Sequence, residues 1–180
     1  IAGIPWWTTD IGGFDYGDPT DKDYQECAIR WFEYATFCPV LRLHGYRAPY
    51  IPADLDAQGG GQCYTGGDNE IWSFGDKAFD VFKKHITLRE RLKPYIKAQM
   101  EEAHKKGTPP MRPLFYDFPN DKNCWDIDDE FMFGPDLLVC PVMDLNQRQR
   151  EVYFPEGHSW IDPYTFREYS GGITFTIDAP

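Results

Sequence analysis

The 180-residue sequence contains no apolar run that approaches the roughly 18 consecutive residues of a membrane-spanning helix. Basic residues are few, because 18 Lys and Arg stand against 29 Asp and Glu and give a formal net charge of -11. An excess of negative charge repels the phosphate backbone of nucleic acids. The sequence therefore predicts neither a membrane nor a nucleic acid as a partner.

The five cysteines lack a pairing pattern: their number is odd, and there is no Cys-x-x-Cys pair and no zinc-type spacing. We expect buried free thiols, which favour a reducing compartment such as the cytoplasm, although a periplasmic or secreted protein would also tolerate them. His85, His104 and His158 add no spacing typical of metal ligands. The sequence predicts no metal site.

Aromatic residues, in contrast, are abundant, since Phe, Trp and Tyr make up 17% of the chain. Such rings fill the cores of most proteins, and they also stack on the C–H faces of sugars. Together with the surplus of carboxylates, this composition is what a carbohydrate site would need. Core packing explains the rings equally well at this point.

The first 45 residues follow the order strand, helix, strand. Residues 4–9 form an apolar, β-prone run that ends at Asp10. Residues 22–37 carry apolar side chains at helical spacing, and residues 40–43 form a second short β-prone run that ends at His44. This order is typical of a β/α protein.

The rest of the chain divides into a loop, a helix and a series of strands. Residues 46–70 form an unusually long connection, a feature that is more often functional than accidental. Residues 75–106 show helical periodicity, with Pro94 expected to kink the helix or divide it in two. Beyond Gly107 we predict only short strands, at residues 111–118, 130–142, 150–154, 158–162, 165–169 and 173–178.

The change from β/α alternation to strands alone predicts a domain boundary near residues 107 to 112, followed by an antiparallel sheet. Two β/α units cannot close a parallel sheet. An eight-fold β/α barrel takes about 250 residues, so residues 1–107 are expected to supply only its last quarter. The sequence thus has the organisation of a segment of a longer protein.

Polar side chains mark the ends of the first two predicted strands. Asp10 ends the first strand, and His44 ends the second with Arg42 on the same face, because side chains alternate along a strand. In β/α barrels the C-terminal strand ends line the active site, so these three residues are expected to converge on one ligand, joined by Phe14. The structural alternative is a capping aspartate, a buried Asp10–Arg42 ion pair and a hydrogen-bonded histidine.

Several segments occur in order and together resemble family 31 of the glycoside hydrolases, which contains α-glucosidases and α-xylosidases. Two of them, Pro5-Trp-Trp-Thr-Thr-Asp-Ile-Gly-Gly-Phe14 and Arg42-Leu-His-Gly45, look most like the bacterial α-xylosidase branch. The others are Arg30-Trp-Phe32, Phe37-Cys-Pro39, Met111-Arg-Pro-Leu-Phe-Tyr-Asp-Phe118 and Phe133-Gly-Pro-Asp-Leu-Leu-Val139. The resemblance extends over nearly the whole chain.

The resemblance implies a retaining hydrolase that works through two carboxylates on a (β/α)8 TIM barrel followed by β-sandwich domains, with no cofactor. Residues 1–107 would be the last two β/α units of the catalytic barrel, and residues 108–180 the start of the C-terminal antiparallel β-sandwich. The fold class expected is therefore α/β plus all-β.

The resemblance assigns substrate-binding residues but no catalytic residue. The family motifs that carry the aspartate nucleophile and the aspartate acid/base precede the segment that matches this chain. Carried over one by one, Asp10, Phe14, Arg42 and His44 fall on positions that line the sugar subsite next to the scissile bond. The partners implied are an α-linked oligosaccharide or α-xyloside substrate and the N-terminal part of the same enzyme.

We therefore expect the C-terminal part of an α-glycosidase that hydrolyses terminal α-linked xylose or glucose. The alternative is a standalone carbohydrate-binding or interaction module without catalytic activity. A further alternative places catalytic carboxylates in the long connection near Asp10, with Asp54, Asp56, Asp68 and Glu70 as candidates.

Overall fold

The computed structural model describes residues 3–51 and 65–180 and divides the chain into two compact units. The first unit comprises Trp6–Pro94, and the second unit comprises Tyr95–Pro180 together with the first five residues. Asp54, Asp56 and Cys63 lie outside the described residues.

Two helices form the core of the first unit. Helix α1 (Lys22–Ala35) begins after Asp21, whose carboxylate accepts a hydrogen bond from the N–H of Asp23, and it confirms the predicted helix at 22–37. Phe32 of α1 stacks on Phe82 of α2 (Asp76–Lys106) with ring centroids 4.5 Å apart. Phe74 meets Phe82 edge-on at 5.6 Å. The aromatic surplus therefore fills core here, where large rings bury the most apolar surface.

Helix α2 confirms the helix predicted at 75–106. Of the two outcomes expected at Pro94, a kink or a division, the division is wrong, because the helix runs unbroken through it. Proline removes one N–H donor from the helix and leaves one carbonyl without its usual bond. Pro94 is exposed, so water can solvate that carbonyl. The helix therefore continues through Pro94 to Lys106.

The strands predicted at 4–9 and 40–43 do not form as regular strands. The two segments instead run side by side, joined by one parallel bridge between Ile11 and Leu43 and by a hydrogen bond from Val40 N to Trp7 O of 3.1 Å. Within the described chain each segment has no strand on its other side, and a two-stranded parallel pair is marginal. The β-rich sequence therefore yields extended chain and a single bridge.

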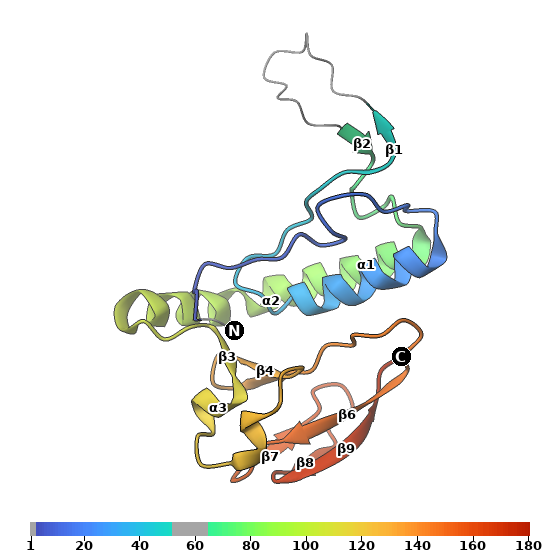
Figure 1. Ribbon diagram of the computed structural model, residues 1–180. Coiled ribbons are helices and arrows are strands. Elements are labelled where there is room, and N and C mark those ends of the chain that lie inside the picture. Colours follow the sequence, from blue (N-terminus) through green and yellow to red (C-terminus); the bar gives the residue numbers. More distant parts are fainter. Residues whose placement is uncertain (1–2, 52–64) are drawn as a thin grey trace. The chain divides into compact units, whose positions relative to one another are not determined.

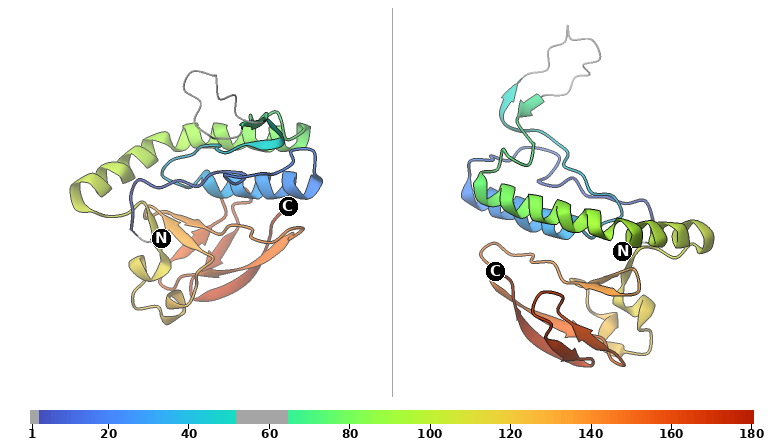
Figure 2. Two further views of the ribbon diagram at one scale, coloured as in Figure 1. Left: turned by 45° about the horizontal axis from the view of Figure 1, so that its top comes forward. Right: turned by 180° about the vertical axis from the view of Figure 1, so that it is seen from behind.

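The direction of these segments nevertheless follows the predicted β/α order. In Figures 1 and 2, α1 and the first part of α2 lie side by side and run in the same direction, opposite to the two extended segments. The connection at 46–70, predicted as a loop, contains an antiparallel pair of strands, β1 (Arg47–Ile51) and β2 (Thr65–Gly67).

The second unit contains antiparallel pairs of strands, as the sequence predicted. A three-stranded sheet has the order β3-β4-β5, and two further pairs are β6 with β9 and β7 with β8. Their bounds are β3 (Met111–Pro113), β4 (Phe131–Phe133), β5 (Leu137–Val139), β6 (Gln149–Phe154), β7 (Ser159–Ile161), β8 (Glu168–Ser170) and β9 (Ile173–Asp178).

Three predicted strands are wrong in part, and the one at 165–169 is strand only from Glu168 on, as β8. The segment 111–118 forms only the short β3 before it turns into α3 (Leu114–Asp117), and a 3₁₀ helix follows at Lys122–Trp125. The segment 130–142 splits into β4 and β5 around Gly134. The Tyr95 hydroxyl donates to Phe133 O at 2.9 Å and accepts from Asp136 N at 3.1 Å. A Cβ on Gly134 would lie 2.2 Å from that hydroxyl oxygen, so only glycine fits this turn.

A buried carboxylate organises the loops of the second unit. Asp121 accepts hydrogen bonds from the Tyr153 hydroxyl at 2.7 Å, Glu156 N at 2.9 Å and Asn123 N at 3.1 Å. Burial alone would raise the pKa of Asp121, but these hydrogen bonds outweigh it and lower that pKa. Asp121 therefore stays charged and links three separate stretches of chain.

A second buried carboxylate has the opposite electrostatic balance. Glu130 is 3% exposed, and its Oε1 accepts from Tyr153 N at 2.8 Å while Arg150 Nη2 lies 3.6 Å away. Arg150 makes a shorter ion pair of 2.7 Å with Asp129. Burial raises the pKa of Glu130 to about 7, because the hydrogen bond and Arg150 offset only part of the desolvation.

We predict that Glu130 makes this unit less stable as the pH rises. Its folded pKa lies above its unfolded value, so the folded state binds the extra proton between about pH 4.5 and about pH 7, and stability falls across that window. Glu130→Gln cannot ionise, so its stability relative to wild type should rise by about 2 to 3 kcal/mol from about pH 5 to about pH 8.

The measurement is hydrogen exchange of the β6 amides in the intact protein, with variant and wild type compared at each pH. The exposed Glu151→Gln on the same strand is the control and should show no such trend. A stability difference between Glu130→Gln and wild type that does not change with pH would contradict the assignment.

Candidate functional site

Asp10 and Arg42 connect the two extended segments of the first unit. Arg42 Nη2 lies 2.7 Å from Asp10 Oδ1, with side chains 48% and 28% exposed, respectively. The ion pair that the structural alternative expected therefore forms, but it is partly exposed and not buried. Because an exposed pair contributes only about 0 to 1 kcal/mol to stability, its main effect is to orient the carboxylate and the guanidinium.

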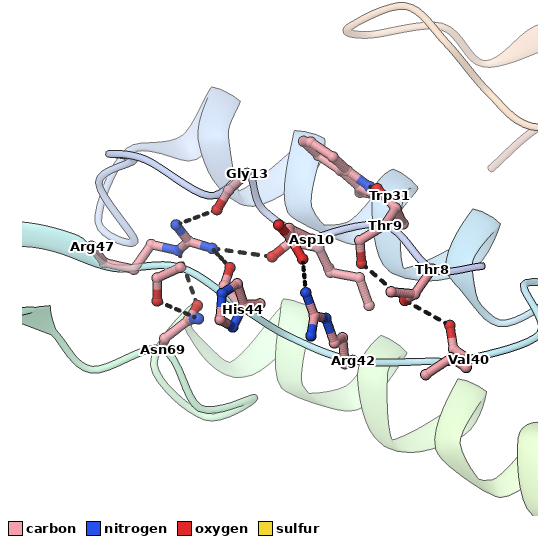
Figure 3. Close-up of polar contacts among 12 residues, drawn as sticks. Thr8, Thr9, Asp10, Gly13, Trp31, Val40, Arg42, His44, Arg47 and Asn69 are labelled. Atoms are coloured by element: carbon pink, nitrogen blue, oxygen red, sulfur yellow. Dashed lines mark hydrogen bonds and ion pairs between the residues drawn. The ribbon is translucent and has the colours of Figure 1, made fainter. Parts of the chain in front are cut away.

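Phe14 and His44 meet a few residues further along the same two segments. Their ring centroids are 5.4 Å apart with a tilt of 41°, and both side chains are exposed. Figure 3 shows Asp10, Arg42 and His44 together where the segments adjoin. The structure thus brings Asp10 to Arg42 and Phe14 to His44, and we call these four residues the rim cluster.

The rim cluster combines an apolar ring face with a carboxylate, a guanidinium and an imidazole. Sugar rings have apolar C–H faces and a belt of hydroxyls that both donate and accept hydrogen bonds. Aromatic faces can stack on the C–H faces of the sugar, and the charged and polar groups can form hydrogen bonds with its hydroxyls. The arrangement can bind and orient a sugar, and within the cluster Asp10 is the sole carboxylate.

Two threonines fix the position of the segment that leads to Asp10 through hydrogen bonds of their hydroxyls. Thr8 Oγ1 donates to Val40 O at 2.8 Å, and Trp31 Nε1 of α1 donates to Thr9 Oγ1 at 2.7 Å. One hydroxyl therefore aligns the first segment with the second, and the other aligns it with the helix (Figure 3). Sequence reasoning treated these residues only as β-prone and missed both contacts.

Glycines at the two turns allow close approach of the backbone. Gly45 has φ +104°, and a Cβ there would lie 2.4 Å from Phe14 O and 2.5 Å from Gly13 O. Gly12 has φ +82°, and its Cβ would lie 2.7 Å from Arg47 Nη2. Residues with a side chain avoid this backbone region, so both positions require glycine.

Arg47 is the residue that sequence reasoning missed. It is completely buried, and its guanidinium donates to Gly13 O at 2.8 Å and to His44 O at 3.2 Å, directly beside the rim cluster. These acceptors are backbone carbonyls, which every residue type carries. No pattern of side chains in the sequence could therefore have revealed the contacts.

Of the four carboxylates proposed in the long connection, Asp68 and Glu70 are exposed, and Asp54 and Asp56 lie outside the described residues. Residues 3–51 and 65–180 gather no group of three or more His, Cys, Asp or Glu side chains that could hold a metal ion, and no helix there is long and apolar enough to cross a membrane. Burial raises the pKa of the free thiols of Cys38 and Cys124 to about 12, whereas Cys27 is exposed.

We predict that Gly45→Ala destabilises the first unit far more than Gly13→Ala. Both glycines have positive φ, which costs a residue with a side chain about 1 to 2 kcal/mol. At Gly13 the nearest atom to a new Cβ is 3.9 Å away, whereas at Gly45 two carbonyl oxygens lie within 2.5 Å. Urea denaturation should show at least about 2 kcal/mol of additional loss for Gly45→Ala. Equal losses would refute the steric explanation.

Comparisons with known proteins cover both units. The model of the glycosyl hydrolases family 31 TIM-barrel domain matches residues 1–99, and that of the glycosyl hydrolase family 31 C-terminal domain matches residues 107–180. An α-xylosidase of Saccharolobus solfataricus is 39% identical over 99% of this chain and 22% of its own length. α-Glucosidase 2 of Bacillus thermoamyloliquefaciens is 31% identical over 99% of this chain and 20% of its own length.

Among solved structures, a family 31 α-xylosidase from a soil metagenome, complexed with xylose, is 53% identical with a TM-score of 0.93. It covers 99% of this chain, which in turn covers 27% of that protein. The chain thus spans about a fifth to a quarter of the length of these relatives.

Proposed function

The chain belongs to glycosyl hydrolase family 31, and we propose that it forms the C-terminal part of a retaining α-glycosidase that hydrolyses terminal α-linked xylose or glucose. The α-xylosidase and α-glucosidase relatives support this class of activity. Xylose has the stronger support, because the structure with 53% identity was solved with xylose bound.

Residues 1–107 are proposed to supply the last two β/α units of the catalytic TIM barrel, and residues 108–180 the start of a C-terminal antiparallel β-sandwich domain. The parallel bridge between Ile11 and Leu43 and the common direction of α1 and α2 support the first assignment. The antiparallel pairing of β3 to β9 supports the second. The catalytic nucleophile and acid/base are then expected in the N-terminal part of the enzyme.

The observation that carries the proposal is the rim cluster: an exposed aromatic pair beside an exposed ion pair, on two parallel segments of the part that matches the barrel domain. A retaining glycosidase passes through an oxocarbenium-like transition state, and hydrogen bonds to ring hydroxyls strengthen as that charge develops. In this role His44 donates to a hydroxyl, Asp10 accepts from one while paired with Arg42, and Phe14 forms the apolar wall.

We predict that His44→Ala in the intact enzyme lowers kcat/KM for nitrophenyl α-xyloside by about 10-fold to 100-fold, the cost of losing one hydrogen bond to a group that develops charge. His85→Ala is the matched control, because that imidazole lies on α2 with its Nδ1 2.9 Å from Val81 O. The control should keep wild-type kinetics. An unchanged kcat/KM for His44→Ala would remove His44 from the sugar site.

A further prediction concerns the 180-residue chain on its own, which should hydrolyse neither nitrophenyl α-xyloside nor nitrophenyl α-glucoside. The reason is that a retaining mechanism needs two carboxyl groups about 5 to 5.5 Å apart, and the proposal places both outside this chain. Release of nitrophenol is the measurement. Turnover by the pure chain would overturn the assignment, whereas binding of xylose without turnover, in a protein with no N-terminal part, would favour the binding module.

A further inference from the structure

A single buried guanidinium lies behind the rim cluster. Arg47 opens β1 and is 0% exposed. Six hydrogen bonds to described residues run from its guanidinium to oxygen atoms. Nε donates to Asn69 Oδ1 at 2.9 Å. Nη1 donates to the carbonyls of Gly13, Tyr16 and Tyr46 at 2.8, 2.9 and 3.0 Å, and Nη2 to those of Ile11 and His44 at 3.0 and 3.2 Å. Burial of a charge is costly unless such bonds satisfy it.

These acceptors belong to three stretches of chain that are separate in sequence. Ile11, Gly13 and Tyr16 lie on the turn after Asp10, and His44 and Tyr46 lie on the turn after Arg42. Asn69 follows β2, and its Nδ2 donates in turn to Gly45 O at 3.2 Å. The guanidinium therefore ties the turn that carries Phe14 to the turn that carries His44, as Figure 3 shows for Gly13, His44 and Asn69.

The surroundings fit the planar shape of this side chain closely. Tyr24 of α1 places its ring 5.8 Å from Arg47 Cζ and donates its hydroxyl to Gly12 O at 2.7 Å. A Cβ on Gly12 would lie within 2.7 Å of Arg47 Nη2, so the glycine of the first turn leaves room for the guanidinium. A lysine ammonium has three donors on a flexible stem and cannot reproduce this fork.

We propose that Arg47 is a positioning residue for the sugar subsite, which holds the Phe14 and His44 turns in register without touching the sugar itself. This inference rests on the function proposed above. Its physical basis is that most bonds of Arg47 go to the backbone of the site turns, whereas the side chains of the rim cluster make one ion pair and one ring contact across the two segments. One backbone bond, from Tyr46 N to Phe14 O at 3.3 Å, also joins the two turns. A displacement of about 1 Å in such a site costs up to about 100-fold in rate.

The test is a double-mutant cycle in the intact enzyme, with kcat and KM measured on nitrophenyl α-xyloside. Arg47→Lys keeps the charge but loses the fork and should lower kcat/KM by at least about 10-fold. In the His44→Ala background the same substitution should cost at least about threefold less than in wild type, because one of the two rings that Arg47 positions is already gone while Phe14 remains.

Arg89→Lys is the control for the loss of an arginine that binds backbone carbonyls; Arg89 is half-buried, whereas Arg47 is fully buried. Arg89 also donates to backbone carbonyls of the first unit, those of Thr36, Cys38 and Pro39, but these follow α1 and carry no rim residue. The variant Arg89→Lys should lower the melting temperature, as Arg47→Lys does, but it should leave kcat/KM within about threefold of wild type. If Arg47→Lys fails to fold, Asn69→Ala, which removes the acceptor of Nε and the bond to Gly45 O, replaces it in the cycle.

The outcomes separate this inference from the function on which it rests. A cost of Arg47→Lys that is equal in both backgrounds, or below about threefold in wild type, overturns the positioning role. A normal kcat/KM in His44→Ala alone overturns the proposed sugar site. A large cost in wild type that falls at least about threefold in His44→Ala, together with normal kinetics in Arg89→Lys, supports the positioning role.

Discussion

The first unit depends on one constraint, the need to satisfy the buried guanidinium of Arg47. Because that charge is removed from water, each of its donors requires an acceptor, and the six bonds to described residues reach three stretches of chain. The pairing of β1 with β2 joins two of these stretches, but within the described residues no regular sheet joins them to the turn after Asp10. The two extended segments share a single bridge, so strand pairing alone would leave their ends poorly fixed. The guanidinium and the glycines that make room for it take over that task. The turns that carry Phe14 and His44 are thereby bonded to a buried side chain, while the side chains of Phe14 and His44 themselves stay exposed.

The second unit uses the same principle with the opposite charge. Asp121 accepts from two backbone N–H groups and one hydroxyl, and so joins the start of a 3₁₀ helix to β6 and to the turn that follows it. Tyr95 serves the β4–β5 turn in a similar way as both donor and acceptor. In a chain with many short strands, such buried polar groups fix loops that ladder hydrogen bonds do not reach. Glu130, whose pKa is about 7, shows that one of these groups is held at an electrostatic cost.

Stability and the proposed recognition of a sugar are consequently assigned to different residues. Core rings such as Phe32 and Phe82 are buried, whereas the rim cluster is largely exposed and contributes little to the energy of the fold. Under the proposed function, substitutions in the rim cluster should act on binding more than on folding. The proposal assigns the catalytic carboxylates to another part of the enzyme.

The sequence by itself determined the features that depend on local pattern and residue type. Helices α1 and α2 follow from apolar periodicity, the antiparallel strands β6, β7 and β9 from β-prone runs between turns, and the family and the Asp10–Arg42 pair from ordered motifs. Only the tertiary structure decided the rest: the segment at 4–9 stays extended for want of a second strand beside it, Leu114–Asp117 coils after three residues of strand, and Arg47 lies at the centre of the turns. For the extended segment and for Arg47 the physical reason is that both outcomes depend on backbone carbonyls far apart in the chain, and every residue carries a carbonyl, so the order of side chains does not record these contacts.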